Sequence, residues 1–158
     1  MNPQRREVLK RGGGVALLAA LAAAGWLKPE QVLAAEAWNK AAFETKSLDE
    51  TLKVLNGGTP AQSKDITFFS TPDIAENGAV VPIGITSAIP KTESIAILVE
   101  KNPNTLAAVF DIPAGTESSL STRIKMGQTS NVYALVKADG KYYIAGKEIK
   151  VTLGGCGG

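Results

Sequence analysis

The sequence predicts a mostly β protein: an antiparallel, immunoglobulin-like β-sandwich with a short N-terminal helical segment and a flexible, glycine-rich C-terminal arm. Three observations lead to this fold class. Short apolar runs bounded by turn residues recur through residues 66–153, about 8 to 14 residues apart, as they do in sandwiches. Helical spacing of apolar residues is confined to the segment before them. The last five residues are four glycines and one cysteine.

Eight strands are expected from these runs, because each run is rich in β-branched or aromatic residues and ends in turn residues. No helical pattern lies between them, so antiparallel neighbours are expected rather than βαβ units. Asp139-Gly140, between two alternating runs, is the strongest hairpin signal, whereas Asn77-Gly78 is predicted to be a turn only. The expected strands are 66–70, 79–87, 94–100, 106–112, 120–126, 131–138, 141–145 and 148–153.

The helical segment precedes the strands. Apolar residues recur at helical spacing from Ala37 to Leu55. Ser47 and Glu50 fit a capping box, which predicts a break before a second helix. Gly57 and Gly58 then provide a C-terminal stop. Two short amphipathic helices that pack on the domain are therefore expected.

The first 35 residues predict an export signal that is not part of the fold. Arg5 and Arg6 open a basic region, and an apolar run follows over 14–27. That run is shorter than the roughly 18 to 20 residues needed to cross a bilayer, so stable membrane insertion is not expected. Small residues up to Ala35 then offer several cleavage sites.

The arginine pair resembles the twin-arginine export motif, although Val8 stands where phenylalanine is common. The twin-arginine translocase is thus an expected partner and the periplasm the expected location, with the general secretory route as the alternative. The predicted domains are a twin-arginine-type signal peptide (1–35, removed), a helical segment (36–58), the sandwich (59–153) and the arm (154–158).

Removal of the signal changes the net charge. The chain has 17 basic and 15 acidic side chains, of which five and two lie in residues 1–35. The remaining 123 residues carry 12 basic and 13 acidic groups, a net charge of −1. Phosphate contacts need a surplus of Lys and Arg on one face, so nucleic acid is not an expected partner.

The chain has no histidine and one cysteine. This composition excludes a Ser-His-Asp triad, a Cys-His pair, a histidine-ligated zinc site and attached haem c within the chain. We therefore expect no catalytic residue, no metal site, no cofactor and no enzymatic activity. An unpaired cysteine in an exported protein forms an intermolecular disulfide or serves as a reactive thiol.

Cys156 is that cysteine, and it stands between two pairs of glycines at the end of the chain. Glycine has no Cβ, so the segment is thin and conformationally free. Extended chain from Leu153 to Cys156 spans about 10 Å. This geometry predicts an arm that brings the thiol into a narrow channel of another protein. The arm glycines are Gly154, Gly155, Gly157 and Gly158.

Longer blocks of the sequence resemble the SoxY family, the sulfur-carrier subunit of the bacterial thiosulfate-oxidising Sox system. The resemblance extends over essentially the whole chain after the signal. It rests on the export signal, the terminal "GGCGG" and the blocks "PDIAENGAVVPI", "SIAILVEKNPNTLAAVF" and "STRIKMGQTSNVYALVKADGKYYIAGKEIKVT".

The resemblance implies a non-enzymatic carrier. The family's functional cysteine maps to Cys156, where sulfur intermediates would be held covalently, first as an S-thiosulfonate. The flexible arm of the family maps to the four terminal glycines. The implied partners are a SoxZ-like subunit in a heterodimer and, transiently, a haem-containing loading enzyme, a sulfate-releasing hydrolase and a sulfur dehydrogenase.

Two other functions fit parts of the sequence. Small cytosolic carriers hold sulfur as a C-terminal thiocarboxylate, which Gly157-Gly158 would suit, but the export signal and the β pattern argue against this class. The second alternative is an exported immunoglobulin-like binding module, in which Cys156 makes an intermolecular disulfide.

Overall fold

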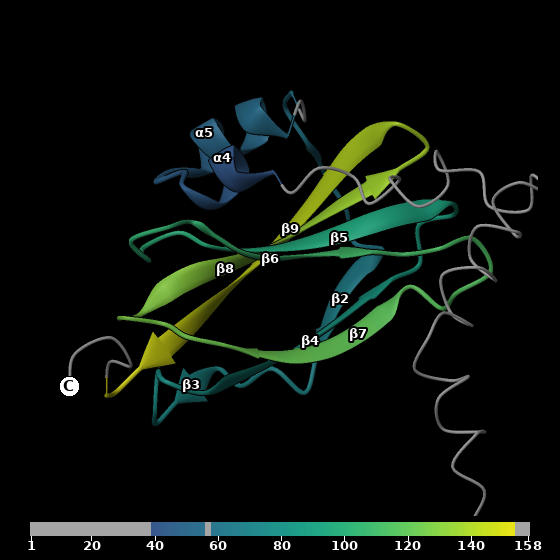
Figure 1. Cartoon of the computed structure of the whole chain (residues 1–158). Coiled ribbons are helices and arrows are strands. Elements are labelled where there is room, and N and C mark those ends of the chain that lie inside the picture. Colours follow the sequence, from purple (N-terminus) through teal and green to yellow (C-terminus); the bar gives the residue numbers. More distant parts are fainter. Residues whose placement is uncertain (1–38, 56–57, 154–158) are drawn as a thin grey trace, which may run out of the picture. The chain divides into compact units, whose positions relative to one another are not determined.

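The computed structural model describes residues 39–55 and 58–153 (Figure 1). The predicted signal peptide with Arg5 and Arg6 lies outside the described residues, and so does the predicted arm with Cys156. The boundaries proposed for these two segments therefore remain predictions.

The described residues form two β-sheets (Figure 1). The larger sheet has the strand order β1-β9-β8-β5-β6, with β3 also paired to β9, and the smaller sheet has the order β2-β4-β7. The strands are β1 (Ala61–Gln62), β2 (Ile66–Phe69), β3 (Ile74–Ala75), β4 (Val81–Ser87), β5 (Thr92–Val99), β6 (Leu106–Asp111), β7 (Ser119–Ile124), β8 (Ser130–Ala138) and β9 (Lys141–Val151).

The core lies between the two sheets and follows from side-chain alternation along the strands. On β5, Ile95, Ile97 and Val99 are fully buried in this core. Ala96 and Leu98 point to the other face of the larger sheet, where they join a second apolar cluster. Because β5 is buried on both faces, its sequence reads as a continuous apolar run and not as an alternating one.

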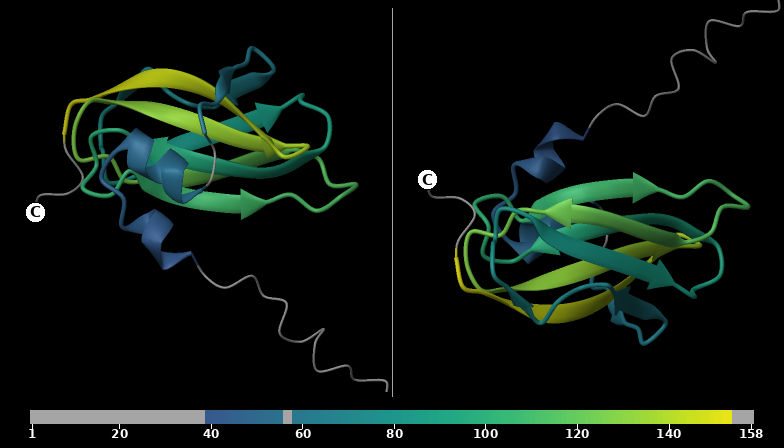
Figure 2. Two further views of the ribbon diagram at one scale, coloured as in Figure 1. Left: turned by 90° about the horizontal axis from the view of Figure 1, so that it is seen from above. Right: turned by 90° about the horizontal axis from the view of Figure 1, so that it is seen from below.

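Two helices, α4 (Lys40–Phe43) and α5 (Leu48–Val54), cover that second cluster. Figure 2 shows them on one side of the strands, in front of them in the view from above. The predicted cap is present: the Glu50 N–H donates to Ser47 Oγ at 3.2 Å. The Glu50 carboxylate in turn accepts from the Lys46 N–H at 2.9 Å. The prediction of two short helices with a break before Ser47 is confirmed.

The fold class is confirmed, since the described residues are mostly strand, in two packed sheets with few helices. One strand prediction was wrong, because the runs 141–145 and 148–153 belong to one continuous strand, β9. Gly146 lies between these two runs. It lies opposite Tyr133 in the β8–β9 pair, and a Cβ there would come within 2.8 Å of the Tyr133 ring. The glycine makes room for the ring while the strand continues.

Two short strands were also missed. Both β1 and β3 pair with β9 in the parallel sense, so the larger sheet is not purely antiparallel. Each strand has only two residues, which is too short for any periodicity to show in the sequence. They form because segments distant in the sequence lie along the outer edge of β9.

Thr105 provides a test of the packing between the helices and the larger sheet. Its side chain is fully buried, and its hydroxyl has no partner among the described residues. Replacement by the isosteric valine removes an unsatisfied polar group, so Thr105→Val is expected to raise the free energy of unfolding by about 1 kcal/mol. Chemical denaturation measures the change.

Thr51→Val is the matched control. The Thr51 hydroxyl is also buried, but it lies 2.6 Å from Thr45 Oγ1 and donates to the Ser47 carbonyl at 2.9 Å. Its loss is expected to lower the free energy of unfolding by about 1 kcal/mol. Equal losses of stability in the two variants would contradict the interpretation of Thr105.

Candidate functional site

The end of β9 is the part of the structure that bears on Cys156, because Leu153 is the last described residue before the arm. We call Thr152 and Leu153 the arm root. The Gly78 N–H donates to the Leu153 carbonyl at 2.7 Å, and the Thr152 N–H donates to the Ala75 carbonyl at 3.1 Å. The Thr152 hydroxyl also donates to the Glu76 carbonyl at 3.1 Å. Residues 73–78, which we call the anchor segment, thus hold the arm root.

The anchor segment is itself tied to the sandwich. The Met126 N–H donates to the Gly78 carbonyl at 2.7 Å, and the Lys150 N–H donates to the Asp73 carbonyl at 2.9 Å. Lys147 Nζ adds an ion pair with Asp73 at 3.0 Å. Figure 1 shows β9 ending beside β3, which lies within the anchor segment. The arm root is therefore fixed, and any reach of the thiol must come from residues 154–156.

Sequence reasoning missed the role of Gly78. The predicted Asn77-Gly78 turn is present, since the Ala79 N–H donates to Asn77 Oδ1 at 2.8 Å. Gly78 also joins the arm root to Met126 through its N–H and carbonyl groups. No local signal reveals this, because its partners lie about 50 and 75 residues further along the chain.

Exposed apolar side chains gather on the segments that meet at the arm root. Leu153 is 66% exposed, Ile74 58% and Val80 54%. Ile74 lies on the anchor segment, and Val80 lies two residues after its end. Exposed apolar side chains are candidates for contact with another protein where they form a contiguous patch. The arm root and these exposed apolar side chains therefore lie on segments that meet at one end of the sandwich.

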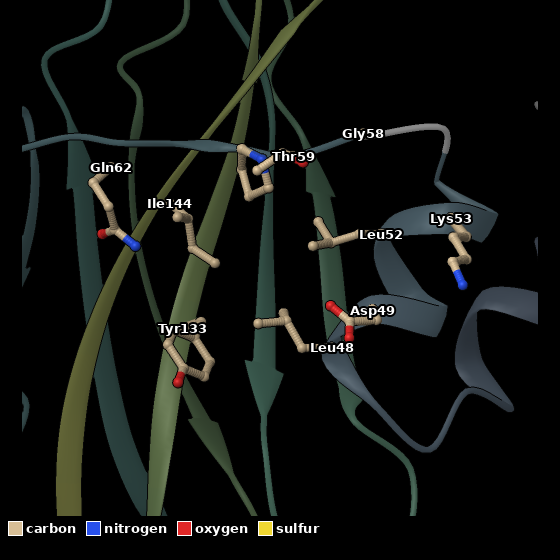
Figure 3. A pocket seen from close by; sticks show the side chains of 10 residues that line it. Leu48, Asp49, Leu52, Lys53, Gly58, Thr59, Gln62, Tyr133 and Ile144 are labelled. Atoms are coloured by element: carbon tan, nitrogen blue, oxygen red, sulfur yellow. The ribbon is translucent and has the colours of Figure 1, made fainter.

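A separate hollow of about 600 Å³ lies between α5 and the outer face of the larger sheet. Leu48 and Leu52 point from α5 toward Tyr133 and Ile144 (Figure 3). Burial, followed by the charge of Glu100, raises the pKa of Tyr133, so its phenol stays protonated at neutral pH. The hollow is thus lined by a neutral phenol and apolar side chains together with the charged side chains of Asp49 and Lys53.

The thiol of the same chain does not reach this hollow. Tyr133 lies on β8 and pairs with Gly146 of β9. Gly146 lies seven residues before Leu153, the end of the arm root. At about 3.3 Å per residue the separation is about 23 Å, whereas Cys156 extends about 10 Å beyond Leu153. An intramolecular docking site for the cysteine is excluded here.

The described part of the chain contains no group of three or more His, Cys, Asp or Glu residues arranged to hold a metal ion. Within the same residues, no helix has the length and apolar character needed to cross a membrane.

The family model described as "Sulfur oxidation protein SoxY" matches residues 52–156. The chain belongs to the SoxY family. Its structure is also similar to that of the sulfur carrier protein SoxY from Chlorobium limicola f thiosulfatophilum, with a TM-score of 0.61 and 35% sequence identity. The match covers 68% of this chain and 97% of the Chlorobium chain.

Other solved structures are more distant. Two variants of a superoxide reductase (neelaredoxin) from Ignicoccus hospitalis match with TM-scores of 0.48 and 0.47 and identities of 14% and 13%. These matches cover 63% and 66% of this chain, and 86% and 92% of the reductase chains. Likeness at this level carries no functional argument. No match was found among curated protein sequences.

The family assignment confirms the resemblance seen in the sequence. SoxY proteins are carriers and not enzymes, as the missing histidine led us to expect. The family also implies partners within the Sox system, such as SoxZ.

Proposed function

We propose that this chain is a periplasmic sulfur carrier that holds thiosulfate-derived sulfur on Cys156 and presents it to successive Sox enzymes. The observation that carries the proposal is the SoxY family match, which extends through the arm as far as Cys156. The fixed arm root supports it, because a stationary root defines where a short arm can place the sulfur.

The chemistry needs only the thiol from this chain. In the loading step, the Cys156 thiolate forms a bond to the outer sulfur of thiosulfate and yields a cysteine S-thiosulfonate, with two electrons passing to the haem-containing loading enzyme. Water then cleaves the bond to the sulfonate group in the hydrolase. This step releases sulfate and two protons and leaves a persulfide on Cys156, which the sulfur dehydrogenase oxidises.

The enzymes dock against the end of the sandwich that bears the arm root. A sulfur atom that extends about 10 Å from Leu153 enters a channel only if the channel mouth lies against that end. The exposed side chains of Ile74, Val80 and Leu153 supply apolar contact area there. Stable association with a SoxZ-like subunit must leave this surface free.

Intact-mass analysis of the protein from thiosulfate-grown cells tests the function. The expected result is a mass increase on Cys156 that a thiol reductant removes. Sulfur held as a thiocarboxylate on Gly158 would survive the reductant, and a disulfide-linked homodimer would appear at twice the mass. Either of those results, without a reducible sulfur adduct on the monomer, would contradict the proposal.

Export makes a further prediction. The protein isolated from the periplasm is expected to begin between Glu36 and Trp38, because the basic, apolar and small-residue regions of a signal peptide end there. N-terminal sequencing checks this. A functional protein that retains residues 1–35 would contradict it. The Arg5-Arg6 pair supports the twin-arginine translocase as the route. If the SoxZ-like subunit has no signal of its own, the two are expected to be exported as a folded pair.

A further inference from the structure

The two edges of the larger sheet differ. The outer edge of β9 is covered by short parallel strands, since Ala61 of β1 pairs with Tyr143 and Ala75 of β3 pairs with Val151. The opposite edge is β6, which pairs with β5 and has no strand on its other side among the described residues. The chain thus covers one edge and leaves the other open.

Hydrogen bonding identifies which groups β6 leaves open. The Ile112 N–H donates to the Glu93 carbonyl at 2.8 Å, which sets the alternation along the antiparallel pair. Phe110 therefore bonds to β5, while Val109 and Asp111 direct their N–H and C=O groups away from it. Within 39–55 and 58–153, no residue bonds to these four groups.

The side chains of β6 protect this edge only at the ends of the strand. Natural edge strands are blunted by lysines, prolines or bulges. From Leu106 to Phe110 the strand has neither a charge nor a proline. Its one charge is the exposed Asp111 at its end, and its one irregularity lies at its start, near Ala107. Val109 is 37% exposed. By contrast, the edge strand β7 of the smaller sheet carries the exposed Arg123.

The open edge lies across the sheet from the arm root. From β9 to β6 the order passes through β8 and β5, three steps of about 4.8 Å or about 14 Å in total. A chain bound along β6 therefore leaves the β9 edge, with the anchor segment, accessible to enzymes. This is the arrangement that a carrier with one lasting partner and several transient ones requires.

We propose that β6 is the docking edge for the stable Sox partner, which adds a β-strand of its own to the larger sheet. This inference rests on the proposed function. The partner is recognised by its chemistry: an exposed strand whose N–H and C=O groups complement those of Val109 and Asp111, with uncharged side chains opposite Ala108 and Phe110.

A proline at Val109 tests the edge. Its missing N–H removes one outward donor and no bond to β5, and edge strands tolerate proline at such positions. Val109→Pro is expected to weaken binding of the SoxZ-type subunit from the same organism at least about tenfold. Val109→Lys, which leaves the backbone free and adds a charge, is expected to act in the same direction.

Ser121→Pro is the matched control. The Ser87 N–H donates to the Ser118 carbonyl at 2.8 Å, so Ser121 on β7 also directs its N–H away from its neighbouring strand. This variant is expected to bind the subunit as the wild type does. Calorimetric titration and size-exclusion chromatography with light scattering give affinity and stoichiometry, and circular dichroism verifies the fold.

Wild-type binding by both Val109 variants would overturn the proposal. Equal weakening by Ser121→Pro would also overturn it, and so would a wild-type homodimer that Val109→Lys dissociates without any effect on the subunit. Sulfur loading of wild-type Cys156 is measured separately by intact mass. Failure to load contradicts the proposed function, whereas failure of the β6 variants contradicts only the docking edge.

Discussion

Cys156→Ser is expected to abolish sulfur loading completely while the fold and partner binding stay unchanged. A serine hydroxyl forms no bond to the outer sulfur of thiosulfate, and the chain has no other cysteine to replace it. The position also lies beyond Leu153, so none of the described hydrogen bonds or core contacts is altered. The measurement is intact mass after incubation with thiosulfate and the haem-containing loading enzyme.

The Cys156→Ser variant also distinguishes the sulfur carrier from the two alternative functions, a thiocarboxylate carrier and a disulfide-linked binding module. A thiocarboxylate carrier would still load sulfur in Cys156→Ser, because its reactive group is the carboxylate of Gly158. A binding module that acts as a disulfide dimer would lose its dimer, yet the wild type would take up no thiosulfate. Residual loading of the serine variant would show that the sulfur is attached elsewhere. Thermal unfolding and titration with the SoxZ-type subunit serve as controls for the fold.

Much of the fold follows from local patterns in the sequence. Ser47 and Glu50 mark the start of α5, because capping depends on residues only three apart. The apolar runs predict the long strands, since alternation and burial are local properties of a strand. The short strands β1 and β3 were not predictable in this way, because they exist only through pairing with β9.

For the candidate site, too, some features can be predicted from the sequence and others only from the folded structure. The arm and Cys156 are predictions from the sequence alone, because glycine pairs flank the one cysteine of the chain, and they lie outside the described residues. The fixed root is not evident, since the Gly78 N–H meets the Leu153 carbonyl only after the sheet has formed. The continuity of β9 through Gly146 likewise depends on the Tyr133 ring of the neighbouring strand.

The arm glycines give the second prediction with a large effect. Gly155→Val and Gly157→Val are each expected to slow enzymatic loading about a hundredfold, a difference of about 2.7 kcal/mol in the activation barrier. A β-branched side chain stiffens the backbone and widens an arm that must enter a channel. The rate is measured by intact mass over time with the loading enzyme.

Lys150→Val is the matched control. It places the same valine side chain at an exposed position of β9, close to the arm root but outside the arm. It is expected to load at the wild-type rate. Gly155→Ala, with one added carbon, is expected to fall between the wild type and Gly155→Val. Reaction of Cys156 with a small thiol reagent is expected to be equal in all four variants.

These rates distinguish the entry of the arm into the enzyme from the chemical reactivity of the Cys156 thiol. If the thiol reagent reacts equally while enzymatic loading falls, the added side chains obstruct the entry of the arm and leave the sulfur itself unaffected. If both valine variants load as fast as Lys150→Val, the channel account is wrong even where Cys156→Ser confirms the carrier. The root would still be fixed by Gly78 and Ala75, so a wide, open enzyme site would then have to meet the sulfur within about 10 Å of Leu153.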